Sequence, residues 1–93
     1  MARYSIVLSD RAKSDLIAHY KSGDKMIIKR IERIFVEFEV NPFSGIGKPD
    51  PLKYGYTGMW SRRLNDKNRI VYLVNEETMI VNVVSAKGHY DDK

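Results

Sequence analysis

The residues best able to do chemistry lie in a basic segment in the middle of the chain and in a short run near its end. Residues 48–69 hold six basic side chains and only two acids, so this segment carries +4, the formal net charge of the whole chain. The basic residues are Lys48, Lys53, Arg62, Arg63, Lys67 and Arg69. Near the end stands His89-Tyr90, and histidine exchanges protons most readily near neutral pH. Because arginine presents a rigid fork of donors to phosphate oxygens, the pattern predicts a phosphate-binding surface beside an acid–base group.

These residue types suffice to cleave RNA with side chains alone. A base must remove the 2′-hydroxyl proton, an acid must protonate the leaving 5′-oxygen, and cations must stabilise the charged phosphorane. Asp50 or a lysine could be the base, His89 or Tyr90 the acid, and the arginines the cations. The chain has no cysteine and no HExxH, Walker or GxSxG motif. We therefore expect neither a metal nor a cofactor.

Each feature also has a simpler explanation when taken alone. A basic segment can be a solvated surface, and strand arginines can protect a sheet edge or form surface ion pairs. The His89-Tyr90 pair can merely close the edge of the sheet. The other histidine, His19, falls in a predicted helix and is expected on the surface or in packing.

The elements that must position these side chains begin with a strand and two helices. Residues 3–8 alternate as a strand does. Ser9 or Asp10 can cap a first helix that ends at Gly23, and Asp24 can cap the second. The first helix has apolar residues at helical spacing, namely Ala12, Leu16, Ile17 and Tyr20. The second has an apolar stripe expected in the core, namely Ile27, Ile31, Ile34, Phe35 and Phe38. The short turn between them predicts an antiparallel helical hairpin.

A long loop and three strands complete the prediction. Seven prolines and glycines within residues 41–58 exclude a helix, and long loops in small domains are often functional. Strands are expected over residues 59–64, 69–74 and 79–86, and the short turns between them predict an antiparallel meander. The result is an α+β fold with both helices packed on one face of the sheet and the other face toward solvent. The 93 residues, 1–93, suit a single domain.

Composition excludes several other classes. Hydrophobic residues make up 43% of the chain and charged residues 30%, which is typical of a globular domain rather than a disordered one. The absence of cysteine excludes a disulfide scaffold. No apolar run approaches the roughly 20 residues of a membrane helix, and no leader segment is recognised, so a cytoplasmic setting is expected.

Four motifs resemble, in this order and spacing, those of the YoeB/Txe toxins of type II toxin–antitoxin systems, within the wider RelE superfamily. They are GKPxPLK at residues 47–53, GxWSRR at 58–63, RxVY at 69–72 and the terminal pair His89-Tyr90. The resemblance runs from the first strand to Tyr90. It implies a RelE-like fold and an endoribonuclease that docks in the ribosomal A site and cuts the mRNA there.

The resemblance also implies roles for individual residues. In this family the 2′-hydroxyl attacks its own phosphodiester, which leaves a 2′,3′-cyclic phosphate and inhibits translation. The catalytic positions correspond to Asp50 as base, Arg69 as transition-state cation and His89 as acid. Positions linked to RNA or phosphate contact correspond to Lys48, Lys53, Arg62, Arg63 and Tyr90.

Asp50 departs from the family, in which the base is a glutamate. Aspartate is one methylene shorter, and a proton-transfer group must come within about 2.6–3.2 Å of its partner. Three outcomes stay open: the loop moves inward, a water bridges the gap, or the activity is weaker.

The family implies two kinds of partner, an antitoxin and the ribosome with its mRNA. A YefM/Axe-like antitoxin has a C-terminal segment that is disordered alone and wraps the toxin on binding. Operator DNA is contacted only indirectly, through the antitoxin. A homodimer is left open, and no membrane partner is expected.

Three alternatives compete with the nuclease. The first is a catalytically weak module of the same fold that binds RNA or antitoxin. The second is a RelE-superfamily toxin that acts on gyrase, against which Arg69 with His89-Tyr90 weighs. The third is a DNA-binding regulator, but the chain lacks a helix-turn-helix with a basic second helix.

Overall fold

Two capped helices follow a short first strand. The computed structural model describes residues 3–47, 49–52 and 58–88. It places β1 at Ser5–Leu8, α1 at Asp10–Ser22 and α2 at Lys25–Val40. Ser9 caps α1 by accepting a hydrogen bond from the Ala12 N–H, and Asp24 caps α2. Gly23 ends α1 in the left-handed conformation, at φ 75°, as predicted for a glycine C-cap.

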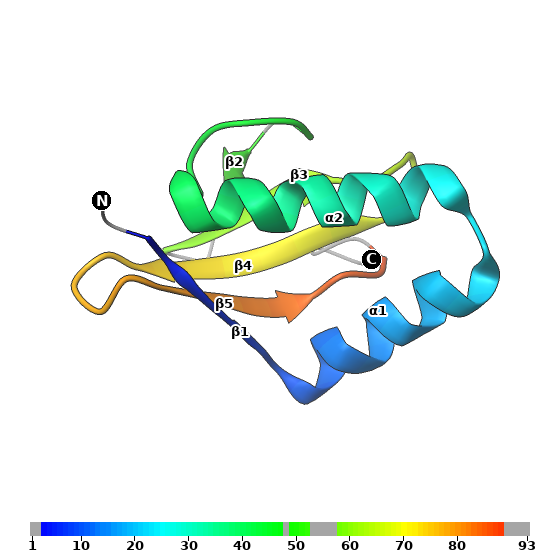
Figure 1. Cartoon of the computed structure of the whole chain (residues 1–93), viewed down its shortest axis with the longest axis horizontal. Helices are drawn as coiled ribbons and strands as arrows, with labels where there is room; N and C mark the ends of the chain where they lie inside the picture. Colours follow the sequence, from blue (N-terminus) through cyan, green and yellow to red (C-terminus); the bar gives the residue numbers. More distant parts are fainter. Residues whose placement is uncertain (1–2, 48, 53–57, 89–93) are drawn as a thin grey trace.

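The sheet has five strands in the order β1-β5-β4-β3-β2 (Figure 1). The remaining strands are β2 (Asp50–Pro51), β3 (Met59–Arg63), β4 (Arg69–Asn75) and β5 (Ile80–Ser85). β3, β4 and β5 form the predicted antiparallel meander, and β1 pairs in parallel with β5. β2 was not predicted, because it lies in the loop expected to be irregular. It is an edge strand, where proline is tolerated because an edge residue need not donate to a neighbour.

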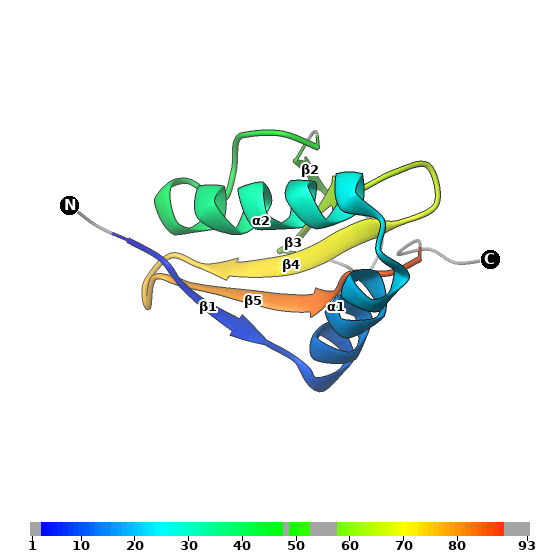
Figure 2. The same cartoon turned by 45° about the vertical axis from the view of Figure 1, so that its right-hand side comes forward.

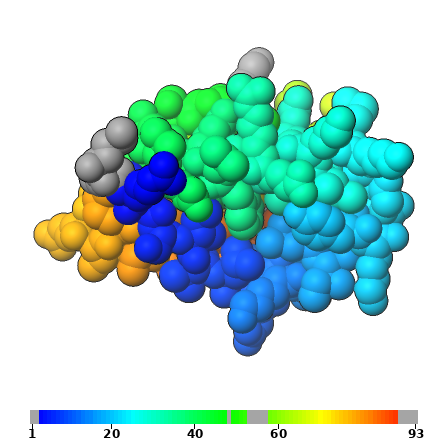
Figure 3. Space-filling view, in the orientation of Figure 1, coloured from blue at the N-terminus to red at the C-terminus, as the bar shows by residue number. Residues whose placement is uncertain are grey.

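Both helices cover the same face of the sheet, as predicted (Figures 1 and 2). Seen from this side, side chains of the helices and β1 hide most of the sheet (Figure 3). The buried core joins α2 to β4 and β5 through Ile27, Ile31, Ile34, Phe38, Ile70, Tyr72, Val81 and Val83. The α+β prediction and most of the α2 stripe are therefore confirmed; Phe35 is only partly buried.

Helix α1 presents a slightly different face from the one predicted. Ala12, Leu16 and His19 are buried, whereas Ile17 and Tyr20 are 54% and 46% exposed. Spacings of three and of four both keep a residue on one helix face, so the sequence could not choose between His19 and Tyr20. Ile17 and Tyr20 therefore lie outside the core, although they stand at helical spacing with Ala12 and Leu16. Neither helix in the described ranges is long and apolar enough to cross a membrane.

The sheet face away from the helices is only partly open to solvent. Strand alternation turns Ser61 and Val71 toward this face, opposite each other, yet both are buried. Asp50 and Arg63 are exposed on it. The expectation of a solvent-facing surface therefore holds only for part of this face.

Candidate active site

Strand register brings three of the predicted site residues onto one face. Asp50 of β2 lies opposite Ser61 of β3, and Arg63, two residues further along β3, lies opposite Arg69 of β4. Opposed residues share a face, as do residues two apart in a strand, so all four point away from the helices. A pocket of about 240 Å³ opens there, lined by Gly47, Pro49, Asp50, Arg63 and Arg69. The pocket therefore combines a carboxylate with two guanidinium groups.

The charged side chains of this pocket form no ion pair within the described residues. Neither Arg63, Arg69 nor Asp50 belongs to any ion pair found in the ranges that the structure describes. Like charges directly opposed across two strands destabilise a sheet, so the Arg63–Arg69 pair has an energetic cost. An anion bound between them would remove this cost. The arrangement can therefore bind a phosphate and place a carboxylate beside it.

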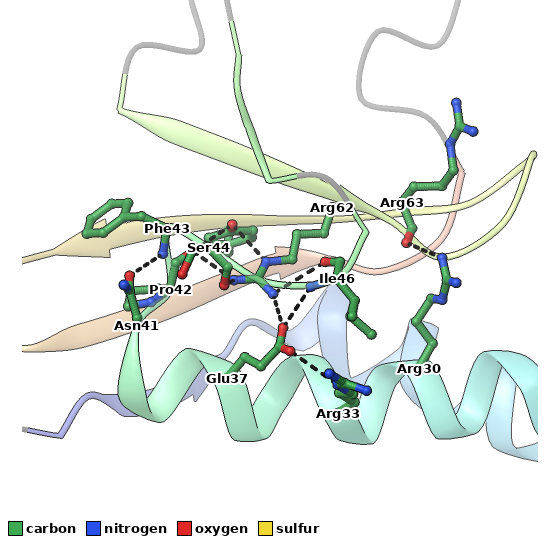
Figure 4. A network of polar contacts seen from close by, with 11 residues as sticks. Arg30, Arg33, Glu37, Asn41, Pro42, Phe43, Ser44, Ile46, Arg62 and Arg63 are labelled. Carbon is green, nitrogen blue, oxygen red and sulfur yellow. Dashed lines mark hydrogen bonds and ion pairs between the residues drawn. The ribbon is translucent and has the colours of Figure 1, made fainter.

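Arg62 points the other way, into the protein (Figure 4). Its side chain is 0% exposed, and its guanidinium lies near the rings of Phe38 and Tyr72. The prediction that Arg62 contacts RNA is therefore wrong, because helix α2 and the loop after it cover this side chain. Consecutive strand residues face opposite sides, so only one of Arg62 and Arg63 can face the pocket.

The Arg62 guanidinium instead joins the loop after α2, residues 41–47, to the helix by hydrogen bonds. Nη1 lies 2.7 Å from Glu37 Oε1 and also donates to the Ile46 carbonyl. Nη2 donates to the carbonyls of Pro42 and Ser44, at 3.1 and 2.8 Å. Nε donates to the Tyr72 hydroxyl. Every polar group of the guanidinium thus has a partner, as a buried charge requires.

The ionisation of two neighbours follows from this network. Burial by itself raises the pKa of Glu37, but hydrogen bonds from the Ile46 N–H, Arg62 and Arg33 bring that pKa below its ordinary value. Burial raises the pKa of Tyr72, although Arg62 acts in the opposite direction. Glu37 is therefore charged, and the Tyr72 hydroxyl keeps the proton that it donates to the Pro42 carbonyl at 2.9 Å.

The loop held by Arg62 ends at the pocket, which Gly47 lines. The Arg63 N–H donates to the Gly47 carbonyl at 2.8 Å, which joins the end of the loop to β3. Gly47 has φ 81°, and a Cβ there would lie 2.8 Å from the Arg63 carbonyl oxygen. Only glycine fits this approach without strain. The network around Arg62 therefore sets the path of the chain toward Pro49 and Asp50.

Four predicted site residues, Lys48, Lys53, His89 and Tyr90, lie outside the described residues. The chain just before His89 is described, since Gly88 N–H donates to Asn68 Oδ1 and the Gly88 carbonyl accepts from the Arg69 N–H. Residue 88 is thus bound to the backbone of Arg69. Among the residues that can be placed, no three of the types His, Asp and Glu form a metal-binding group.

Sequence reasoning missed the supporting residues Glu37 and Tyr72. Glu37 stands outside the apolar stripe of α2 in the sequence, yet its side chain is only 21% exposed. The sequence did contain a signal. Arg62 and Arg63 are consecutive in a strand, so helices that pack on one face of the sheet must cover one of the two. That buried arginine then needs a carboxylate, and α2 supplies it.

Known proteins resemble this chain in both structure and sequence. The fold is that of a small bacterial toxin, since a YoeB/ParE toxin from Agrobacterium tumefaciens has a TM-score of 0.81 and 29% identity, and the alignment covers 92% of this chain and 99% of that one. A YoeB dimer from Staphylococcus aureus has a TM-score of 0.79 and 36% identity, and the alignment covers 96% of this chain and 100% of that one. A heterotetrameric YoeB-YefM toxin-antitoxin complex from the same species has a TM-score of 0.76, again with 36% identity and coverage of 96% and 100%.

The sequence comparisons agree. The Toxin YoeB of Streptomyces coelicolor is 39% identical over 72 residues, which are 77% of this chain and 83% of that toxin. The family model of the YoeB-like toxins of bacterial type II toxin-antitoxin systems matches residues 9–90. The chain belongs to this family, so it is a toxin of a type II system, and the resemblance noted in its motifs is confirmed.

Proposed function

We propose that this toxin is an endoribonuclease that cuts mRNA in the ribosomal A site and thereby inhibits translation. The observation that carries the proposal is the pocket in which Asp50 lies with Arg63 and Arg69. A base beside two cations is what attack of a 2′-hydroxyl on its own phosphodiester needs. Family membership supports the same chemistry.

The proposed reaction moves two protons and exchanges one bond. Asp50 takes the proton of the 2′-hydroxyl, whose oxygen bonds to phosphorus while the bond to the 5′-oxygen breaks. Arg69, with Arg63 beside it, stabilises the charge on the phosphorane. Protonated His89 gives its proton to the 5′-oxygen. The products are a 2′,3′-cyclic phosphate and a 5′-hydroxyl, and proton exchange with solvent restores Asp50 and His89.

Other residues assist in different ways. Lys48, Lys53 and Tyr90 stay proposed RNA contacts. Arg62 acts indirectly, by holding the loop that leads to Asp50. No step of the proposed reaction uses a metal or a cofactor.

The length of the Asp50 side chain limits the proposed activity. Asp50 sits in β2 and is paired with β3, so its backbone is held by a strand rather than by a free loop. Restoring the family residue with Asp50→Glu should then raise the cleavage rate, whereas Asp50→Ala should abolish it. Unchanged rates in both variants would favour the alternative, a catalytically weak module that binds RNA or antitoxin.

The partners follow from the relatives. Because a YoeB from Staphylococcus aureus is found in a complex with YefM, we propose that a YefM-like antitoxin holds this toxin inactive. Operator DNA would be reached only through that antitoxin. The dimer of the same relative supports a homodimer of this chain. The target, a translating ribosome, places the action in the cytoplasm.

Ribosomes programmed with a defined mRNA provide the test. Primer extension maps the new 5′ ends, and Arg69→Gln and His89→Ala are compared with the wild type after a check of folding. Lys67→Gln is the matched control, since it removes a positive charge from an exposed turn residue that does not line the pocket. We expect A-site cleavage by the wild type and the control only. Ribosome binding without cleavage by the wild type would refute the nuclease proposal.

A further inference from the structure

Two side chains of α1 hold Ala86, the residue directly after β5. The Ala86 N–H donates to Asp15 Oδ2 at 3.0 Å, and His19 Nε2 lies 2.6 Å from the Ala86 carbonyl oxygen. Because a carbonyl only accepts, Nε2 carries the proton of this bond. Asp15 and His19 are four residues apart and therefore share one helix face. Both backbone groups of a fully buried residue are thus bound by side chains of one helix.

The chain is held again two residues later. The Gly88 N–H donates to Asn68 Oδ1 at 2.9 Å, and its carbonyl accepts from the Arg69 N–H at 3.0 Å. Gly88 has φ 81°, a conformation that favours glycine. Four hydrogen bonds therefore fix residues 86–88, next to Arg69 and just before His89.

Packing alone does not account for these contacts. An apolar side chain at position 19 would fill the same space, whereas a buried histidine needs bonding partners. The N-cap Ser9 also bonds to β5, since its Oγ donates to the Val84 carbonyl at 2.7 Å. Polar contacts from three positions along α1 thus converge on the end of β5, which lies against this helix (Figure 2). They fix where the chain leaves the sheet.

We propose that Asp15 and His19 are positioning residues that, by holding Ala86, fix the described chain just before His89 and so support the proton transfer assigned to His89. This inference rests on the proposed function, because it takes His89 as the group that protonates the leaving oxygen. Proton transfer requires close approach, and a displacement of about 1 Å can cost about 100-fold in rate. Freeing Ala86 should therefore slow cleavage without weakening the binding of the programmed ribosome.

Two pairs of variants and one control test the proposal. His19→Leu removes the donor, whereas His19→Gln keeps a donor at a similar distance from the helix. Asp15→Ala and Asp15→Asn form the second pair, at a position that tolerates change better because it is partly exposed. Leu16→Ala is the matched control, since it removes core atoms from the same helix without a hydrogen bond to Ala86. Single-turnover cleavage at increasing ribosome concentration separates the maximal rate from the half-saturating concentration, with folding checked by circular dichroism.

We expect His19→Leu and Asp15→Ala to lose about tenfold or more in maximal rate at an unchanged half-saturating concentration. The Gln and Asn variants should recover most of the rate, and Leu16→Ala should keep it. Exchange of the Gly88 amide should be faster in His19→Leu than in the control. Rates of the folded Leu and Ala variants within about twofold of the wild type, or an equal loss in Leu16→Ala, would overturn the inference. If His89→Ala cleaves like the wild type, the proposed function fails and takes this inference with it; if only His89→Ala is slow, this inference alone fails.

Discussion

Replacing Glu37 with alanine tests whether the buried ion pair holds the loop after α2. Glu37 Oε1 lies 2.7 Å from Nη1 of Arg62, whose side chain is 0% exposed. Removing one partner of a buried pair leaves the other charge uncompensated, which costs about 3–5 kcal/mol. Because Glu37 is 21% exposed, water can enter part of the vacated space, and we expect the lower end, about 3 kcal/mol. That is a large share of the roughly 5–15 kcal/mol that stabilises a domain.

Urea unfolding followed by the fluorescence of Trp60 measures this loss, and an unchanged m-value shows that the same two states are compared. Arg33→Ala is the matched control. Its Nε lies 3.2 Å from the other carboxylate oxygen of Glu37, but its side chain is 68% exposed, so its loss should cost at most about 0.5 kcal/mol. A cost below about 1 kcal/mol for Glu37→Ala, or equal costs for the two variants, would refute the reasoning.

Three further predictions follow from the site. Folding lowers the pKa of the Glu37 carboxyl, so the unfolded chain binds that proton more readily. The free energy of unfolding should therefore fall as the pH drops below the ordinary value of 4.5 and through the folded pKa. Urea titrations at a series of pH values measure this fall, and Glu37→Gln should flatten it. Gly47→Ala should destabilise by more than the roughly 1–2 kcal/mol of a left-handed alanine, because its Cβ meets the Arg63 carbonyl. Gly23→Ala is the control, because a Cβ at Gly23 meets nothing within 4 Å and the variant has only the cost of the left-handed backbone. Equal falls in melting temperature for the two variants would contradict the predicted clash with the Arg63 carbonyl. Arg63→Gln should raise the free energy of unfolding by about 0.2–1 kcal/mol, since it relieves repulsion by Arg69, and the gain should shrink at high salt. A gain that is independent of salt would show that repulsion is not its cause.

The predictable parts of the fold are those with a strong local signal. The α2 stripe, from Ile27 to Phe38, follows a helical period over about three turns. The caps at Ser9, Gly23 and Asp24 have side chains or backbone freedom suited to those positions. β2 has no such signal, since two residues that include a proline show no periodicity. It forms because the edge of β3 offers partners, which is a tertiary cause.

The candidate site could be predicted in its residue types but not in its geometry. Asp50, Arg63 and Arg69 meet because of the register of three strands, which the sequence does not specify. Arg62 and Arg63 are chemically identical neighbours, and their opposite roles depend on which strand face the helices cover. The hydrogen bonds from Asp15 and His19 to Ala86 join residues that are about 70 positions apart in the sequence, so no local pattern could reveal them.

The parallel pairing of β1 with β5 has a consequence for synthesis of the toxin. Ser5 pairs with Ile80, so the first strand finds its partner only when nearly the whole chain has been made. Contacts of such long sequence separation form late and slow folding. A growing chain still lacking β5 has no strand to bridge β1 to the meander and cannot form the contacts between α1 and β5. The molecule therefore completes its core, and with it the hydrogen bonds that hold residues 86–88, only after β5 has been translated.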